Sequence, residues 1–170
     1  MNTVIGWIGV GSMGSRMAAN LSKGGYPLII SDKISTEAAP KDVQIAKNNQ
    51  ELARKAELVI FSVPAGPDTL TIAKEFINTP DSIVKTVIDT STIGIPHAKE
   101  AFELFKSHGI EYIDAPVSGG IAGAEAGTLA VMVGCRLDSF NKFKTILECV
   151  GQNVIHVGSE AGQGQTVKLL

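Results

Sequence analysis

The feature that most constrains this chain is a glycine motif near its amino terminus, Gly9-x-Gly11-x-x-Gly14. It follows the apolar residues 4–8, which predict a buried strand, and it precedes residues 15–23, which predict an amphipathic helix. Between a strand and a helix, this spacing is typical of dinucleotide-binding turns. Gly9 permits a tight turn, Gly11 lets the backbone approach a pyrophosphate, and Gly14 lets the helix pack closely on the strand.

Asp32 supplies the second part of this pattern, because it ends the next predicted strand, residues 26–31. It follows the glycines at roughly the 20-residue distance that the pattern requires. A carboxylate there accepts hydrogen bonds from both adenosine ribose hydroxyls and repels a 2′-phosphate, which predicts NAD rather than NADP. The alternatives are a glycine turn without a ligand and an Asp32 that only caps a helix. The predicted cofactor residues of this region are Gly9, Val10, Gly11, Ser12, Met13, Gly14 and Asp32.

The rest of the chain alternates between apolar strand patterns and amphipathic helix patterns. This alternation predicts an α/β fold of Rossmann type with a mostly parallel, doubly wound sheet. Residues 35–40 are expected to form a short helix or a loop. Strands are predicted at residues 58–63, 84–88, 110–114, 129–133 and 154–157, and helices at 49–56, 68–77, 96–108 and 138–149.

Composition excludes several other classes of protein. The net charge is −2 with the two signs interspersed, which argues against a nucleic-acid partner. No stretch reaches the roughly 18 apolar residues of a membrane span, and the first residues lack a basic leader. Cys135 and Cys149 form neither a disulfide framework nor a metal-ligand spacing. We therefore expect a cytoplasmic protein with no membrane partner and no metal site.

Further candidate residues follow the predicted strands, where open α/β sheets bind ligands. Val63, Pro64 and Asp68 follow one strand, and Thr92 follows another; turns and helix caps are the alternative interpretation. A third group is Ser118-Gly119-Gly120, whose hydroxyl and exposed amides suit a small carboxylate or carbonyl oxygen. No histidine lies nearby in the sequence and no G-x-S-x-G elbow is present, so we interpret Ser118 as a hydrogen-bonding residue rather than a nucleophile.

The end of the chain predicts an interrupted helix. Residues 161–170 have helix-forming character from Gln165 onward, and no Gly, Asn or Pro stops the helix before Leu170. We expect residues 1–160 to form the dinucleotide-binding domain and residues 161–170 to begin an inter-domain helix. Lys168 by itself is an ordinary lysine on a polar helix face.

Four segments together resemble the β-hydroxyacid dehydrogenase family, most closely its members that act on 3-hydroxyisobutyrate. They are residues 8–21, 89–92, 114–120 with 123–129, and 158–168. The resemblance covers essentially the whole chain, but only the amino-terminal half of such an enzyme. It implies that the family's all-helical carboxy-terminal domain, and an asparagine four residues after the catalytic lysine, are absent from this sequence.

The resemblance implies NAD(P)-dependent oxidation of a β-hydroxy acid to its semialdehyde, or the reverse reduction. Lys168 matches the family's catalytic lysine, a general acid/base. Ser118, Gly119 and Gly120 match the substrate-binding motif, and Pro64 and Thr92 match positions near the nicotinamide. Asp32 matches NAD-preferring members, although Lys33 beside it leaves modest NADP use open.

The missing domain closes the substrate cleft and forms most of the dimer interface in the family. We therefore expect the full-length parent to be a homo-oligomer, a dimer or tetramer, and this chain alone to be inactive. The alternatives within the family are reductases of tartronate semialdehyde or succinic semialdehyde. From other classes, a non-catalytic NAD-binding module and an anion-binding α/β domain remain.

Overall fold

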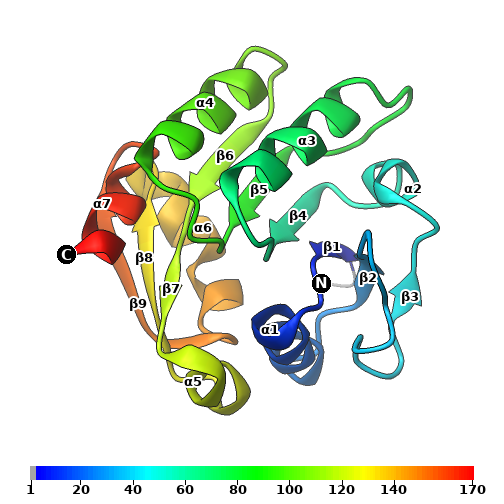
Figure 1. Ribbon diagram of the computed structural model, residues 1–170, viewed down its shortest axis with the longest axis horizontal. Coiled ribbons are helices and arrows are strands. Elements are labelled where there is room, and N and C mark those ends of the chain that lie inside the picture. Colours follow the sequence, from blue (N-terminus) through cyan, green and yellow to red (C-terminus); the bar gives the residue numbers. More distant parts are fainter. Residues whose placement is uncertain (1–2) are drawn as a thin grey trace.

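The computed structural model describes residues 3–170, and these form a nine-stranded sheet with helices on both faces (Figure 1). The strands are β1 (Ile5–Ile8), β2 (Leu28–Ser31), β3 (Gln44–Ile45), β4 (Leu58–Phe61), β5 (Thr86–Asp89), β6 (Glu111–Asp114), β7 (Val117–Ser118), β8 (Leu129–Gly134) and β9 (Gly151–Gly158). The helices are α1 (Ser12–Lys23), α2 (Asn49–Ala53), α3 (Gly66–Ile77), α4 (Ile95–Lys106), α5 (Gly120–Ala126), α6 (Leu137–Leu147) and α7 (Gln163–Leu169).

The strand order confirms the predicted Rossmann-type topology. Strands β3, β2, β1, β4, β5 and β6 are neighbours in that order, and each of these pairs is parallel. The chain winds outward from β1 to β3, then returns to place β4 on the other side of β1. The order therefore reverses between β1 and β4, and such a reversal opens a crevice at the carboxyl ends of the strands.

The last strands depart from the parallel pattern. β8 pairs antiparallel with β6 and β7, and β9 pairs parallel with β8 on the far side. The sheet is thus mostly parallel with a mixed end. That end carries α7 and the carboxyl terminus, on the left in Figure 1.

Two apolar cores, one on each face of the sheet, hold the layers together. The central strands are apolar on both faces, as buried parallel strands are. Trp7 of β1 faces the first core, and the next residue, Ile8, faces the second. Helices α1, α5 and α6 cover the first core, and α2, α3 and α4 cover the second; Figure 1 shows the two groups on opposite sides of the sheet.

Three elements were not predicted from the sequence: β3, β7 and α5. The two strands have two residues each, too few to show a periodicity. Helix α5 consists mostly of glycine and alanine and has no large apolar stripe. It is held instead by long-range contacts, since Ala124 is buried and its carbonyl accepts a hydrogen bond of 2.8 Å from Asn20 Nδ2 of α1. Residues 35–40 form bends and turns, so the loop interpretation is confirmed.

Within the described residues 3–170, no helix is long and apolar enough to cross a membrane.

Candidate functional site

The glycine turn between β1 and α1 has the close contacts that its spacing predicts. Gly9 has a φ of +101°, and a Cβ built there would lie 2.0 Å from the carbonyl oxygen of Ser62. A Cβ at Gly14 would lie 2.0 Å from the carbonyl oxygen of Gly9. A side chain is therefore excluded at both positions, because the turn packs directly against the end of β4.

Gly11 differs from the other two glycines, because a Cβ there would meet no described atom within 4 Å. Its position is open rather than packed. Gly11 is also the N-cap of α1, and within residues 3–170 no side chain caps this helix. The amide groups of the first turn of α1 therefore remain available to an anion, which the helix dipole attracts.

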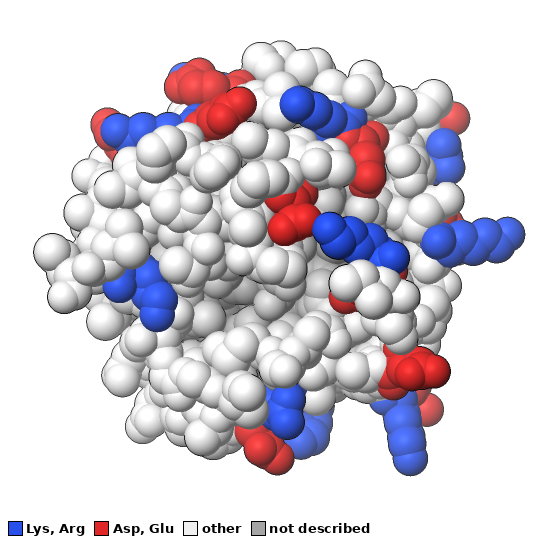
Figure 2. Space-filling model, viewed as in Figure 1, with Lys and Arg blue, Asp and Glu red and all other residues white. Residues whose placement is uncertain are grey.

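A cleft of about 430 Å³ opens beside this turn, where the strand order reverses. Figure 2 shows this face of the molecule hollowed near its centre. The cleft is bounded by the glycine turn, by the residues after β2 and β4, by the start of α2 and by one side of α3. Its lining residues are Ile8, Gly9, Gly11, Ser12, Met13, Gly14, Asp32, Lys33, Ile34, Asn49, Ser62, Val63, Pro64, Asp68, Thr71, Ile72 and Glu75.

The predicted cofactor residues lie together in this cleft, with two exceptions, Val10 and Thr92. The side chain of Val10 is buried in the first core, and its backbone N–H donates to Asp32. Thr92 is exposed and follows β5, two strands away from β1. The open Gly11, the uncapped α1 and the nearby carboxylate of Asp32 fit a dinucleotide. Sequence reasoning did not identify Asn49, Thr71 and Glu75, because these residues belong to no local motif.

Asp32 fixes the end of β2 against the glycine turn. Its Oδ2 accepts the N–H of Val10 at 2.8 Å, and its Oδ1 accepts the N–H groups of Ile34 at 2.8 Å and Ser35 at 3.2 Å. The carboxylate is partly exposed and lines the cleft. It does not cap a helix, because residues 35–40 are not helical; it holds a turn instead.

Helix α7, which carries Lys168, is anchored by the buried side chain of Gln165. This side chain is fully buried. Its Oε1 accepts the N–H groups of Ile93 at 3.0 Å and Gly94 at 3.1 Å. Its Nε2 donates to the carbonyl oxygen of Ser91 at 3.0 Å and to Asp114 Oδ1 at 2.8 Å. One amide thus joins α7 to the loop after β5 and to the end of β6.

Asp114 completes this anchor from the end of β6. Its Oδ2 accepts the N–H groups of Gly162 at 2.9 Å and Gln165 at 3.1 Å, at the amino end of α7. Burial raises the pKa of Asp114, while the hydrogen bonds from Gln165 and Gly162 act in the opposite direction. Sequence reasoning did not single out Gln165 as an anchor, because its partners lie far away along the chain and no local motif marks it.

The predicted substrate residues lie beyond the cleft, toward the mixed end of the sheet. Ser118, Gly119 and Gly120 are exposed at the junction of β7 and α5, and the two glycines have φ values of +139° and +67°. Lys168 is half-buried, and no described carboxylate forms an ion pair with it. Both β7 and α7 contact β8, so these residues belong to one end of the sheet.

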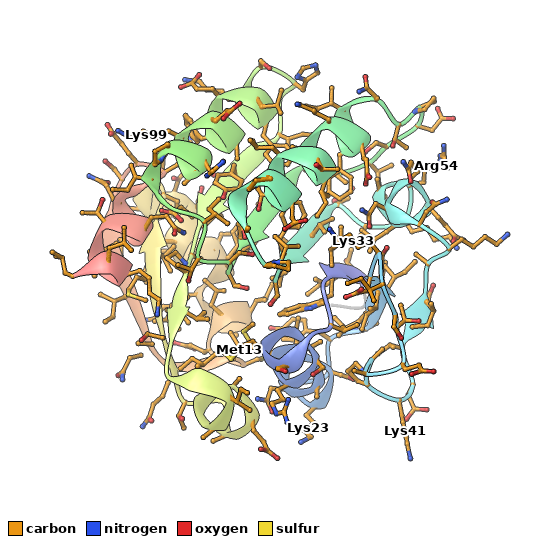
Figure 3. All side chains as sticks on the ribbon, viewed as in Figure 1. Met13, Lys23, Lys33, Lys41, Arg54 and Lys99 are labelled. Carbon is orange, nitrogen blue, oxygen red and sulfur yellow. The ribbon has the colours of Figure 1, made fainter. Side chains whose placement is uncertain are left out.

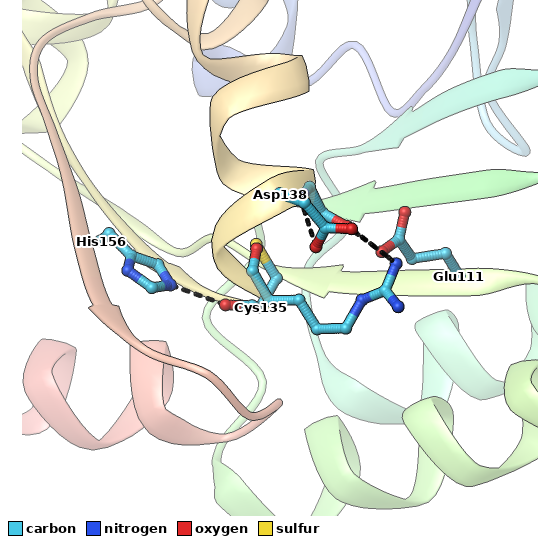
Figure 4. Close-up of polar contacts among 6 residues, drawn as sticks. Glu111, Cys135, Asp138 and His156 are labelled. Carbon is cyan, nitrogen blue, oxygen red and sulfur yellow. Dashed lines mark hydrogen bonds and ion pairs between the residues drawn. The ribbon is translucent and has the colours of Figure 1, made fainter.

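A separate polar cluster surrounds the start of α6, and Figure 4 shows it in close-up. Arg136 lies 3.3 Å from Asp138, and Ser139 donates a hydrogen bond to Glu111. Burial raises the pKa of the Cys135 thiol to about 12, so the sulfur stays protonated and unreactive at neutral pH. None of these residues lines the cleft. The cluster therefore serves to hold α6 rather than to bind a cofactor.

The strand order, the glycine turn and the cleft define a Rossmann-type dinucleotide-binding domain. Residues 4–158 match the family model described as the NAD binding domain of 6-phosphogluconate dehydrogenase, and the chain belongs to this family. The dehydrogenase resemblance and the assignment of NAD as cofactor are thereby confirmed at the level of the family.

Comparison with individual proteins gives the same assignment. The chain is 37% identical over 174 residues to the probable mitochondrial 3-hydroxyisobutyrate dehydrogenase of Dictyostelium discoideum, covering 97% of this chain and 53% of that protein. It is 34% identical to 2-(hydroxymethyl)glutarate dehydrogenase of Eubacterium barkeri, covering 98% and 56%. The structure of Mycobacterium tuberculosis 3-hydroxyisobutyrate dehydrogenase with L-serine superposes with a TM-score of 0.91 at 34% identity, covering 99% and 58%. The chain spans about half the length of the curated relatives it matches.

Proposed function

We propose that this chain is the cofactor-binding half of an NAD-dependent dehydrogenase. The enzyme would oxidise a β-hydroxy acid of the 3-hydroxyisobutyrate type to its semialdehyde, or catalyse the reverse reduction. The observation that best supports this proposal is the Gln165 anchor. It fixes the helix that carries Lys168 to the same carboxyl edge of the sheet that carries the dinucleotide cleft.

The cofactor side of the proposal assigns roles to the cleft. Gly9, Gly11 and Gly14 would bring the first turn of α1 to the pyrophosphate, and Asp32 would accept hydrogen bonds from the adenosine ribose. Bound NAD supplies the group that accepts or donates hydride. The nicotinamide half would pass Val63 and Pro64 at the end of β4 and reach Thr92 after β5. NADP is the less favoured cofactor, because Asp32 repels a 2′-phosphate.

The substrate side of the proposal uses the mixed end of the sheet. The Ser118 hydroxyl and the N–H groups of Gly119 and Gly120 would bind the substrate carboxylate. Lys168 would accept the proton of the substrate hydroxyl during oxidation and return it to the carbonyl oxygen during reduction. General acid–base help of this kind typically contributes about 10²–10⁴-fold in rate.

The domain limits are part of the proposal. Residues 1–160 would form the NAD-binding domain, and residues 161–170 would begin the helix that leads to the second half of the enzyme. Since the matched relatives are about twice as long as this chain, we propose that the chain alone is inactive and that the complete enzyme is a homo-oligomer. Both cysteines are free thiols, which suits a reducing compartment such as the cytoplasm; the Dictyostelium relative is named as mitochondrial.

The proposal assigns the substrate to one chemical class with several candidate members. Similarity to both 3-hydroxyisobutyrate dehydrogenase and 2-(hydroxymethyl)glutarate dehydrogenase supports a short acid with a primary alcohol near its carboxylate. Tartronate semialdehyde and succinic semialdehyde reductases are the alternatives. A non-catalytic NAD-binding module is the alternative from another class.

The test uses the complete enzyme of which we propose residues 1–170 are the amino-terminal half. A panel of the named hydroxy acids and semialdehydes identifies the substrate. Lys168→Ala should then lower kcat by about 100-fold or more, while the Kd for NADH stays within about twofold. Lys168→Arg is the matched control, because it keeps the charge but is a poor proton donor. Full turnover of Lys168→Ala would refute the role of the lysine, and NADH binding without turnover of any substrate would favour the non-catalytic module.

A further inference from the structure

The outer end of the cleft, away from the glycine turn, holds an unequal set of charges. Among the described lining residues, Asp32, Asp68 and Glu75 are acidic and Lys33 is the one cation. Lys33 directly follows the carboxylate that we assign to the adenosine ribose. It is therefore the group best placed to attract a phosphate on the ribose 2′ oxygen, which is the single difference between NADP and NAD.

Lys33 is not free, because its ammonium group is held by Asp68. Lys33 Nζ donates a hydrogen bond of 2.8 Å to Asp68 Oδ1. Lys33 follows β2 and Asp68 lies in the first turn of α3, so this ion pair joins two walls of the cleft; Figure 3 labels Lys33 between these elements. The hydrogen bond to Asp68 and the charge of that carboxylate raise the pKa of Lys33, which keeps it protonated at neutral pH.

Glu75 provides an internal comparison, because it lies on the same helix and lines the same cleft but binds a different partner. Its Oε2 accepts a hydrogen bond of 2.6 Å from Asn49 Nδ2. The Asn49 side chain in turn accepts a hydrogen bond from the hydroxyl of Ser31 at 2.7 Å. Glu75 thus contributes negative charge to the cleft without holding Lys33.

We propose that Asp68 is a positioning residue that sets cofactor selectivity by binding Lys33 and withholding it from a 2′-phosphate. This inference rests on the proposed binding of NAD in the cleft. Asp32 would disfavour NADP by direct repulsion of the 2′-phosphate. Asp68 would disfavour NADP by pairing with Lys33, the cation that could otherwise neutralise the 2′-phosphate. The Lys33 side chain is 70% exposed, and ion pairs at such sites are weak. The contribution of Asp68 to selectivity is therefore modest, and a single substitution should remove it.

The experiment measures the Kd of NADH and NADPH for the 170-residue chain by titration calorimetry. The variants are Asp68→Asn, Lys33→Gln, the double variant, and Glu75→Gln as the matched control. Asn at position 68 keeps a side-chain acceptor in the first turn of α3 and removes only the charge. Thermal melts check that each variant is folded, which we expect because these side chains are partly or fully exposed.

The expected result is a ratio of Kd(NADPH) to Kd(NADH) that falls by up to about fivefold in Asp68→Asn, the upper range of one exposed ion pair. The fall should vanish when Lys33→Gln is added, and it should be stronger at low salt. Glu75→Gln removes the same negative charge from the cleft as Asp68→Asn does. It should lower the ratio of Kd(NADPH) to Kd(NADH) clearly less.

Three outcomes would overturn the proposal. Equal effects of Asp68→Asn and Glu75→Gln would mean that only the net charge matters. A fall that persists in the double variant would mean that Lys33 is not the intermediary. An unchanged ratio of Kd(NADPH) to Kd(NADH) in Asp68→Asn would show that Asp68 does not affect cofactor selectivity. By contrast, a folded chain that binds neither cofactor in any variant would refute the proposed cleft function itself.

Discussion

The two ends of this carboxyl edge are built in opposite ways. The glycine turn is a continuous piece of chain, residues 9–14. Its three glycines have no side chains, so the backbone of the turn can be approached closely. The α7 end is assembled from side chains, because Gln165 and Asp114 join segments that are far apart in the sequence. The comparison teaches that an added side chain at a glycine should disrupt the glycine turn. The α7 end should instead be disrupted by the loss of particular side chains.

The largest expected effect breaks the glycine turn. Gly14→Ala places a Cβ against the carbonyl of Gly9, and we expect it to lower the free energy of unfolding by about 3 kcal/mol and to abolish NADH binding. Gly11→Ala should separate the two effects. Gly11 has φ −72° and ψ −162°, which alanine adopts readily, and its Cβ would point into open space. We expect an unchanged melting temperature and an NADH affinity lowered about tenfold, since one poorly placed methyl costs about 1–2 kcal/mol.

Denaturant unfolding and calorimetric titration of both variants make this comparison. If Gly11→Ala binds NADH as the unmodified chain does, the cofactor does not approach this turn and the interpretation of the motif is wrong.

An intermediate effect is expected at the α7 end. Gln165→Leu removes the side-chain amide that pairs with four groups and takes away the donor to Asp114 Oδ1, while Oδ2 keeps its backbone donors. We expect it to lower the free energy of unfolding by about 2–3 kcal/mol. Gln163→Leu is the matched control, because Gln163 is exposed on the same helix and its Oε1 accepts a single backbone hydrogen bond. It should cost less than about 1 kcal/mol.

NADH binding of the folded Gln165→Leu variant tests whether the two regions are independent. We expect the Kd to stay within about threefold of the unmodified chain, equivalent to less than about 1 kcal/mol. A loss of binding as complete as in Gly14→Ala would show that the glycine turn depends on the α7 anchor.

The smallest effect concerns pH, and it too belongs to the side-chain-built end. Burial raises the pKa of Asp89, although hydrogen bonds from Ser91, Thr69 and Tyr112 partly offset this. The folded chain therefore holds this proton more tightly than the unfolded chain. The resulting stabilisation is complete below the unfolded pKa of about 4 and is lost as pH rises through the raised folded pKa. Burial acts on Asp114 in the same direction.

Unfolding free energies measured from mildly acidic to neutral pH check this prediction. In Asp89→Asn the fall with rising pH should be shallower than in the unmodified chain, because the ionisable group is gone. Parallel pH profiles of the two proteins would show that Asp89 does not contribute to the pH dependence of folding.

The same contrast explains how much could be predicted from the sequence. The mostly parallel sheet and the glycine turn were predictable, because apolar runs, helical periodicity and a short glycine spacing are all local signals. Even the close approach of Gly14 to Gly9 follows from a pattern six residues long. The motif residues at positions 9, 11, 12, 13 and 14 all line the cleft, although its other walls come from distant segments.

What could not be predicted depends on long-range contacts. The partners of Gln165 lie between 51 and 74 positions away along the chain, and Asp68 lies 35 positions from Lys33. Neither pairing leaves a periodicity to detect. Helix α5 was missed for the same reason, because its stability comes from α1 and β8 rather than from its own sequence. The roles of Lys168 and Ser118 stay predictions.

One contact inside the first core has an optical consequence. Trp7 is the one tryptophan of the sequence, and its buried indole Nε1 donates a hydrogen bond of 2.8 Å to the carbonyl oxygen of Gly9. The same carbonyl limits the approach of Gly14 to the turn. Any ligand that shifts this turn must change the surroundings of the indole ring. Its fluorescence emission also overlaps the absorption of a reduced nicotinamide, so the chain carries an intrinsic fluorophore buried behind the turn that borders its cleft, and it needs no added label.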